Sequence, residues 1–343
     1  MQIIDLPVGD QVTEPGFYRT PLSWYHSTSF CDGPSMSSSM ARSMFPDLPY
    51  GICPAHFWAF WKGNPDAPEQ VEEPAWASFG SAAHALMLGD ENFEENYIVR
   101  PVRSDFPEAL DTMSEMRAYL DAPERQAPHK PSDTKSILIE RCKDEDPNVL
   151  IWSEVLAEFE RRRGSKRVIS TDDYRAIEAM SEVLRRHPAV RAGLLDGHAE
   201  VSIVARDPIT GIWLKSRLDN LPANAVQTDL KTTSHALPSK RQREITDKLY
   251  FAQLAWGRMV RRLVDGVVAT ENSIIFSGKD YPHHATWHPV GSGSLDIGDI
   301  LNRLAIDAFA HGMKTGEWPG YESEINYQVP EFIGANITGV PTP

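Results

Sequence analysis

The sequence predicts a mixed α/β (α+β) fold, in which a central mixed sheet is flanked by helices and preceded by a helical N-terminal part. Two observations carry this prediction. After Gly197 the helical periodicity gives way to strand-like runs rich in apolar and β-branched residues: HAEVSIVAR, GIWLKSRLD and AVQTDLKTT. A helical pattern over 241–264 and another strand-like run, GVVATENSIIFSG, come next. Strands and helices that alternate in this way share one core.

The preceding half of the chain is expected to be mainly helical. A helix is predicted from about Ser37 through AHFWAFW, and a Pro/Glu-rich connector follows at 63–75. The small residues ASFGSAAHALMLG (77–89) predict a compact helix that carries His84 and ends at Gly89. Small side chains permit close packing, so we expect His84 to sit on a rigid, central helix.

Residues 104–190 have helical patterns broken by prolines, and the last helix opens with the cap sequence STDD. We therefore expect one domain over 1–343. Its parts are a mainly helical region (1–195), a core sheet with the helix 241–264 (196–290), and a final helix with a peripheral tail (291–343).

Composition limits the class of protein. The chain is 41% hydrophobic and 24% charged, as is usual for soluble globular proteins, and no apolar run is long enough to span a membrane. Its three scattered cysteines form neither a disulfide framework nor a zinc site, so a reducing, cytoplasmic setting is expected. The net charge of −14 argues against indiscriminate DNA coating. Basic clusters at 161–167, at 239–243 and at Arg258, Arg261 and Arg262 matter only if they line the same cleft as the acidic residues described next.

The stretch RLDNLPANAVQTDLKTT places Asp219 ten positions before the triplet Asp229–Leu230–Lys231. The flanks resemble two strands and LPANA a turn, so a hairpin would bring two carboxylates and one ammonium together. Two adjacent carboxylates repel unless a cation lies between them, and oxygen ligands suit Mg²⁺ or Mn²⁺. A lysine beside a metal can orient or deprotonate a water, or offset charge on a phosphate. The alternative is a surface hairpin with solvated charges.

Several further motifs occur in a fixed order with this triplet: MSSSMA, CPAHFW, FGSAAHALMLG, HPAV, AEVSI, TGIWLKSRLD, TDLKTT and YFAQLAW. Together they resemble the PD-(D/E)xK nuclease superfamily, in particular the RecE-type (exodeoxyribonuclease VIII-like) phage and prophage exonucleases. The resemblance spans roughly residues 25–260 and implies a restriction-endonuclease-like core.

The resemblance also implies roles for particular residues. His84, Asp219 and Asp229 would be metal ligands together with the carbonyl of Leu230, and Lys231 would be the catalytic lysine. Glu200 would bind a second metal or hold a metal-bound water. Tyr250 and Gln253 match a motif helix that contacts the nucleic acid backbone, although the aromatic residue usual four positions later is Gly257 here. A serine at Ser37 or Ser39, together with Arg217, would grip a terminal phosphate.

Some of these residues also have a purely structural interpretation: His84 as a core histidine, Glu200 as a solvent-facing residue, and Ser37 and Ser39 as helix caps.

The resemblance implies that the chain is a Mg²⁺-dependent exonuclease that binds one or two ions and accepts Mn²⁺ in place of Mg²⁺. Its substrate would be double-stranded DNA ends, digested 5′→3′ to leave 3′ single-stranded tails for recombination. The resemblance also implies a ring-like homo-oligomer and a partner single-strand annealing protein. The alternatives are a related endonuclease, a helicase-associated nuclease module, or a non-catalytic DNA-binding scaffold.

Overall fold

The computed structural model describes residues 2–45, 48, 51–69, 75–89, 93–222 and 225–321. Its strands are β1 (Ile3–Asp5), β2 (Gly16–Arg19), β3 (Ser35–Ser37), β4 (Tyr97–Val99), β5 (Arg167–Ile169), β6 (His198–Arg206), β7 (Trp213–Leu221), β8 (Val226–Thr233), β9 (Glu271–Gly278) and β10 (Ala285–Pro289). Its helices are α1 (Leu22–Tyr25), α2 (Ser38–Ser43), α3 (Pro54–Phe60), α4 (Ala75–Met87), α5 (Phe93–Asn96), a 3₁₀ turn (Arg103–Asp105), α6 (Met113–Leu120), α7 (Lys135–Glu145), α8 (Trp152–Arg163), α9 (Thr171–Arg186), α10 (Pro188–Arg191), α11 (Pro238–Asp247), α12 (Tyr250–Asp265) and α13 (Ser292–Thr315).

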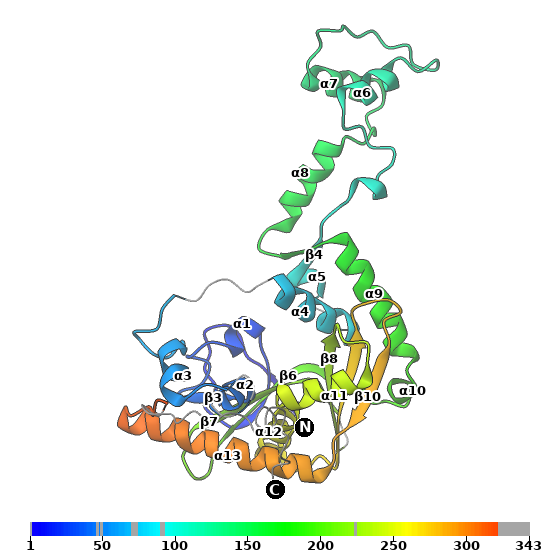
Figure 1. The fold of residues 1–343 in the computed structure, drawn as a ribbon. Coiled ribbons are helices and arrows are strands. Elements are labelled where there is room, and N and C mark those ends of the chain that lie inside the picture. Colours follow the sequence, from blue (N-terminus) through cyan, green and yellow to red (C-terminus); the bar gives the residue numbers. More distant parts are fainter. Residues whose placement is uncertain are drawn as a thin grey trace, which may run out of the picture.

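Two mixed sheets form the centre of the molecule, which confirms the predicted α/β class. One has the order β1-β2-β6-β7-β3 and the other the order β10-β9-β8. Both are mixed. In the first, β3 runs parallel to β7 and β6 antiparallel to it; in the second, β8 runs parallel to β9 and β10 antiparallel to it. Helix α12 contacts β6, β7 and β8 and therefore bridges the two sheets, and α13 packs on α12 (Figure 1).

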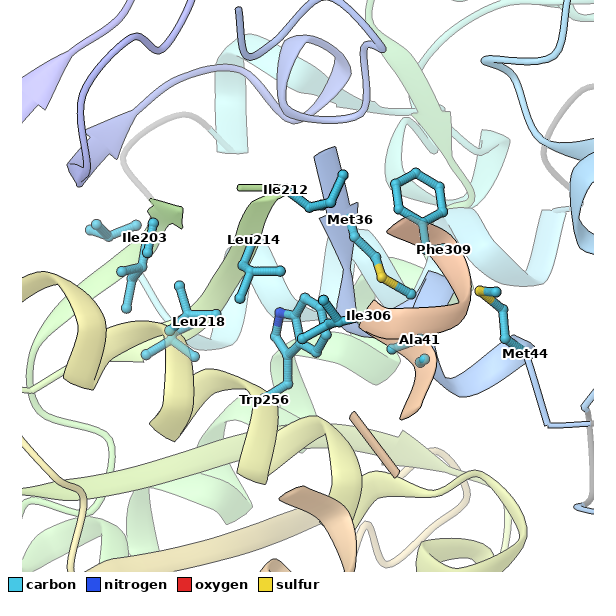
Figure 2. Close-up of a cluster of buried hydrophobic side chains, with 14 of the residues drawn as sticks. Met36, Ala41, Met44, Ile203, Ile212, Leu214, Leu218, Trp256, Ile306 and Phe309 are labelled. Atoms are coloured by element: carbon cyan, nitrogen blue, oxygen red, sulfur yellow. The ribbon is translucent and has the colours of Figure 1, made fainter. Parts of the chain in front are cut away.

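The main hydrophobic core lies between the five-stranded sheet and the helices α2, α12 and α13. Figure 2 shows Trp256 of α12 at its centre, close to Leu214 and Ile306. The indole Nε1 of Trp256 donates to the carbonyl of Lys215 at 3.0 Å, so this aromatic residue also fixes the helix against β7. A second core, around Leu230 and Ile275, joins α4 and α9 to the three-stranded sheet.

The predicted hairpin is wrong in its pairing. Strand β8 forms a parallel ladder with β9 from Val226↔Glu271 to Thr233↔Gly278, so its backbone groups are satisfied there rather than by β7. Within the described residues, β7 and β8 belong to different sheets but remain in contact. At this junction a side chain takes the place of a backbone partner, because the amide of Leu230 donates to Oδ2 of Asp219 at 2.6 Å.

The predicted helix 241–264 is in fact two helices, α11 and α12. Leu249 lies between them with φ 51° and ψ 40°, a left-handed conformation that a continuous α-helix does not contain. The helix predicted from Ser37 through AHFWAFW is likewise divided into α2 and α3, and Pro54 occupies the first turn of α3. The predicted cap of α9 is confirmed, since Ser170 accepts a hydrogen bond from the amide of Asp173.

A helical arm formed by α6, α7 and α8 projects from the rest of the molecule (Figure 1). It has a separate hydrophobic cluster that includes Met116, Leu120 and Leu138. At its base, β4 and β5 pair in parallel and contact α5 and α4 respectively. The predicted tail lies largely outside the described residues, but its first part packs on α3, where Trp318 stacks on Trp58 at 4.8 Å between ring centroids. None of the helices in the described segments is long and apolar enough to cross a membrane.

Lys215 of β7 is buried, with 5% of its surface exposed, and its cation has no carboxylate partner among the contacts of the described chain. Its Nζ donates to the carbonyl of Tyr25 at 2.7 Å and lies over the rings of Tyr25 and Phe30. Burial lowers the pKa of Lys215 to about 8. The folded protein thus releases this proton near pH 8, whereas the unfolded chain holds it to about pH 10.4.

We expect the stability of wild type relative to a Lys215→Met variant to increase as the pH rises. Between about pH 8 and 10.4 the unfolded state binds more protons than the native state, so the free energy of unfolding rises with pH. The difference between wild type and variant should grow in favour of wild type by up to about 3 kcal/mol across that range. Urea unfolding at pH 7, 8.5 and 10 measures this difference, and a difference that stays constant would contradict the prediction.

Candidate active site

The Asp-x-Lys triplet lies on β8, and the alternation of a strand explains its arrangement. Asp229 and Lys231 are two residues apart, so their side chains share one face, whereas Leu230 points to the opposite face. Leu230 is fully buried in the core beneath α4. Nζ of Lys231 lies 2.6 Å from Oδ2 of Asp229. The apolar residue between the two charged ones therefore anchors the strand and fixes where they project.

Glu200 on β6 and Asp219 on β7 occupy opposing positions of the antiparallel ladder. The ladder pairs Ala199 with Asn220 and Val201 with Leu218, and it skips the intervening pair Glu200–Asp219. Glu200 has φ 55°, a left-handed conformation that costs a residue with a side chain on the order of 1–3 kcal/mol. Like charges directly opposite each other are also unfavourable. Strain and repulsion at one position of an otherwise regular ladder mark it as a functional site.

His84 extends from α4 to meet these carboxylates. Its Nδ1 lies 3.5 Å from Oδ1 of Asp219, and one ligand atom from each of His84, Glu200 and Asp219 lies within 4.8 Å of the others. The prediction that α4 is closely packed is confirmed, since Ala82 and Ala83 are fully buried in the core shared with β8 and α9. A helix from early in the chain and two consecutive strands more than one hundred residues later therefore converge on one point.

The guanidinium of Arg217 supplies a positive charge beside Glu200. Its Nε donates to Oε2 of Glu200 at 2.6 Å, and its Nη1 donates to the carbonyl of Thr20 at 2.9 Å. Arg217 and Asp219 are two residues apart on β7 and so share one face of the strand. The arginine thus holds the Glu200 carboxylate at the edge of the His84–Asp219 pair.

The electrostatic balance favours the charged form of Asp219. Burial alone would raise the pKa of this carboxyl, but His84, Lys231 and the Leu230 amide together lower it to about 2. Burial would lower the pKa of His84, yet the Asp219 carboxylate outweighs it and raises that pKa. An ionised carboxylate and an imidazole this close together can both serve as ligands to a cation.

The other two carboxylates are destabilised as anions. Burial and the Asp219 charge raise the pKa of Glu200, and burial also raises the pKa of Asp229, which Lys231 only partly offsets. Burial would lower the pKa of Lys231, but Asp229 and Asp219 raise it. Each of the three carboxylates has a cationic neighbour, yet the charge of Asp219 still raises the pKa of both Glu200 and Asp229, and a divalent ion among the carboxylates would offset this repulsion.

Helix α12 completes one wall of the site. Nε2 of Gln253 donates to Oδ1 of Asp229 at 3.0 Å and orients that carboxylate. The Tyr250 ring lies 5.1 Å from Nζ of Lys231, 5.7 Å from the Arg42 guanidinium and 5.8 Å from Nζ of Lys248. Because Leu249 breaks the helix just before Tyr250, the first turn of α12 carries both predicted residues into contact with the Asp-x-Lys face.

The remaining predicted residues lie at or near this point, with differences in detail. Oγ of Ser37 and Oγ of Ser39 are 3.0 Å apart at the start of α2, but Ser38, between them, lines the small cavity beside Arg217 and Asp219. The amide of Leu230 is the backbone group that meets Asp219. Asp229 faces Lys231 and Gln253, whereas Glu200 lies within the three-residue cluster, although the resemblance gives Asp229 the first-metal role.

The sequence interpretation missed Gln227, and it noted Gly257 without its structural reason. Nε2 of Gln227, buried on β8, donates to the carbonyl of Leu254 at 2.9 Å and ties α12 to the strand. Gly257 explains the missing aromatic residue, because a Cβ there would lie 2.9 Å from Nε2 of Gln227 and 3.0 Å from Cδ2 of Leu218. The glycine thus permits α12 to approach β7 and β8 closely. In the sequence, only the glycine at a position where the motif has an aromatic residue indicated this close approach.

The predicted basic clusters do not line this site as a group. Arg161 and Arg163 pair with glutamates one turn earlier on α8, and Arg258 pairs with Asp299 of α13. Arg241 is buried and holds backbone carbonyls. These arginines therefore hold neighbouring parts of the protein together and do not form a basic wall of the site.

The residues present fit a divalent metal ion. His84, Glu200 and Asp219 offer one imidazole nitrogen and carboxylate oxygens in a partly buried position, and Asp229 lies beside them. Carboxylate ligands suit Mg²⁺ and Mn²⁺, and imidazole is compatible with first-row transition metals.

Comparison with known proteins agrees with this geometry. No curated protein matches the sequence. A crystal structure of a protein from Eubacterium rectale, described as a candidate exonuclease, matches with a TM-score of 0.50 and 13% identity, covering 89% of this chain and 92% of that one. At this identity the match shows the fold alone. Residues 37–327, which include every element of the site, match a family model, and the chain therefore belongs to the PDDEXK-like domains of unknown function (DUF3799).

Proposed function

We propose that this protein is a divalent-metal-dependent nuclease that hydrolyses phosphodiester bonds of DNA. The convergence of His84, Glu200 and Asp219 within 4.8 Å, beside the Asp229–Lys231 pair, carries the proposal. Crowded carboxylates at a strained ladder position are costly for a protein that only binds DNA, because removing them would relieve both repulsion and strain. Membership in a PDDEXK-like family supports the same activity.

Phosphodiester hydrolysis requires positioning and charge neutralisation more than covalent chemistry. A bound Mg²⁺ or Mn²⁺ would polarise the scissile phosphate and activate a water. His84, Glu200 and Asp219 would hold the ion, with Asp229 as a further oxygen ligand. Lys231 would contact the phosphate or the attacking water, offsetting negative charge as it develops. Gln253 would hold Asp229 in place through its hydrogen bond.

We further propose the RecE-type activity: digestion of linear duplex DNA from its ends, 5′→3′, leaving 3′ single-stranded tails for recombination. Resemblance of the ordered motifs to those exonucleases supports this choice. Arg217 with the Ser37–Ser39 segment would bind the terminal phosphate, and Tyr250 would contact the backbone of the strand being cut. A ring-like homo-oligomer and a partner single-strand annealing protein belong to the same proposal.

Digestion of matched DNA substrates tests the proposal. We expect loss of linear duplex in the presence of Mg²⁺ or Mn²⁺, none with EDTA, and none of a covalently closed circle of the same sequence. Duplexes labelled at one end and blocked at either the 5′ or the 3′ terminus report polarity, and a block at the 5′ terminus should stop digestion.

The other outcomes separate the alternatives. Cutting of the closed circle would indicate an endonuclease. Protection by a 3′ block would reverse the polarity without affecting the nuclease assignment. DNA binding with no cleavage under any divalent ion, together with no metal binding in calorimetry, would contradict the nuclease proposal and favour a scaffold.

A further inference from the structure

The turn between β9 and β10, residues 279–284, lies at the same edge of the sheet as the catalytic lysine. β8 and β9 run parallel, with Thr233 opposite Gly278, and the amide of Lys279 donates to the carbonyl of Thr233 at 2.8 Å. Thr233 follows Lys231 by two residues, about 7 Å along a strand. The turn therefore begins where the catalytic strand ends, and Figure 1 shows it at the end of the sheet that lies beside α4.

This turn is held firmly. Nδ1 of His283 lies 3.1 Å from the carbonyl oxygen of Gly278, and the His284 carbonyl accepts from the buried guanidinium of Arg241 at 3.0 Å. Nζ of Lys279 lies 4.9 Å from the ring centroid of Phe79, which is on the helix that carries His84. The turn is thereby braced against α11 and against α4, so its tip has a defined position relative to the site.

The tip itself presents an exposed aromatic ring. Tyr281 is 90% exposed, and its described ring contact is an edge-on one with His283 at 6.4 Å between centroids. A tyrosine held away from the core on a braced turn offers a planar face at little entropic cost to a ligand. The turn carries Asp280 as well as Lys279, so these two charges cancel. The turn therefore offers DNA little electrostatic attraction.

We propose that Tyr281 is a base-stacking contact for the DNA substrate, a role that rests on the proposed nuclease function. Aromatic side chains stack on unpaired or terminal bases without sequence preference. The backbone at Tyr281 lies at most about 20 Å from that of Lys231, along two residues of β8, across the hydrogen bond from Lys279 to Thr233 and along two residues of the turn. At about 3.4 Å per nucleotide of one strand, the stacked base lies within about six nucleotides of the scissile phosphate.

Binding without cleavage tests this contact. A duplex with a short single-stranded tail, carrying 2-aminopurine at successive positions around the junction, is titrated with protein in EDTA and followed by anisotropy and by 2-aminopurine fluorescence. We expect Tyr281→Ala to weaken binding about 5- to 100-fold and to abolish fluorescence quenching at one or two positions. Tyr281→Phe should retain both signals, and Phe60→Ala, which removes an exposed ring on α3, should change neither.

Salt separates stacking from charge. Because stacking releases no counterions, the fold-loss caused by Tyr281→Ala should be the same at 50 and 200 mM salt. Unchanged affinity in Tyr281→Ala, or an equal loss in Phe60→Ala, would overturn the inference and leave the nuclease proposal intact. Wild-type protein that binds the tailed duplex, shows the Tyr281 effect and yet never cleaves DNA would refute the nuclease proposal alone. Failure of wild type both to bind the tailed duplex and to cleave DNA with Mg²⁺ or Mn²⁺ present would refute both.

Discussion

Replacing Asp219 by Asn should greatly weaken both metal binding and cleavage. The substitution keeps the shape of the side chain but removes the charge that His84, Lys231 and the Leu230 amide stabilise. Loss of an outer partner of a metal ligand costs about 10- to 100-fold in affinity, so loss of the ligand charge should cost about 100-fold or more. Cleavage should fall at least about 1,000-fold, because the metal and its positioning are lost together. Calorimetric titration with Mn²⁺ and a linear-duplex assay measure the two effects.

Asp207→Asn is the matched control. Asp207 is also a buried carboxylate, paired with Arg303 at 2.8 Å, but it lies in the β6–β7 turn away from the site. This control should lose stability and keep metal affinity. If Asp219→Asn bound Mn²⁺ as tightly as wild type, the cluster with His84 and Glu200 would not be the metal site.

Replacing Lys231 by Met should separate catalysis from metal binding. The ammonium lies 2.6 Å from Oδ2 of Asp229, and both side chains are largely buried. We expect kcat to fall about 100- to 10,000-fold, because a positioned group that moves a proton or offsets transition-state charge is lost. Mn²⁺ affinity should stay within a few-fold of wild type, since the lysine offers no ligand atom to the ion.

The same variant should be less stable, because one partner of a buried ion pair is left without the other, at a cost of about 3–5 kcal/mol. Urea unfolding measures this loss, and the kinetics are taken where the variant is still folded. Lys135→Met, which removes an exposed lysine paired with Asp111 on the arm, should leave kcat unchanged. Lys231→Arg distinguishes the two roles: an always-charged guanidinium can offset charge but cannot accept a proton. Full activity of Lys231→Met would remove Lys231 from the mechanism.

The sequence predicted which of these residues lie together better than it predicted how the strands that carry them are paired. Alternation along a strand was enough to place Asp229 and Lys231 on one face, whatever the partner of β8. The short LPANA connector favoured a hairpin, but a connector of that length also fits a chain that passes from one sheet to another. Choosing between them required knowing that β9, more than forty residues later, pairs with β8 along its whole length.

Other features were hidden because they depend on tertiary contacts. The apolar periodicity continues across Leu249, so no local signal announced the break between α11 and α12. Glu200 was recognisable by its place in a motif, but its left-handed backbone was not. Lys215 and Gln227 read as ordinary strand residues, and only the packing of α1 and α12 shows why they are buried. Propensity and pattern specify elements, whereas neighbours distant in sequence specify these exceptions.

The arm formed by α6, α7 and α8 is, in topological terms, the crossover connection between the parallel strands β4 and β5. Such a connection needs only about a dozen residues, far fewer than the chain between Val99 and Arg167. The surplus folds around its own apolar cluster, including Met116 and Leu138, and so draws little support from the two central sheets. A change in the length of this connection should therefore leave His84, Glu200 and Asp219 in their positions.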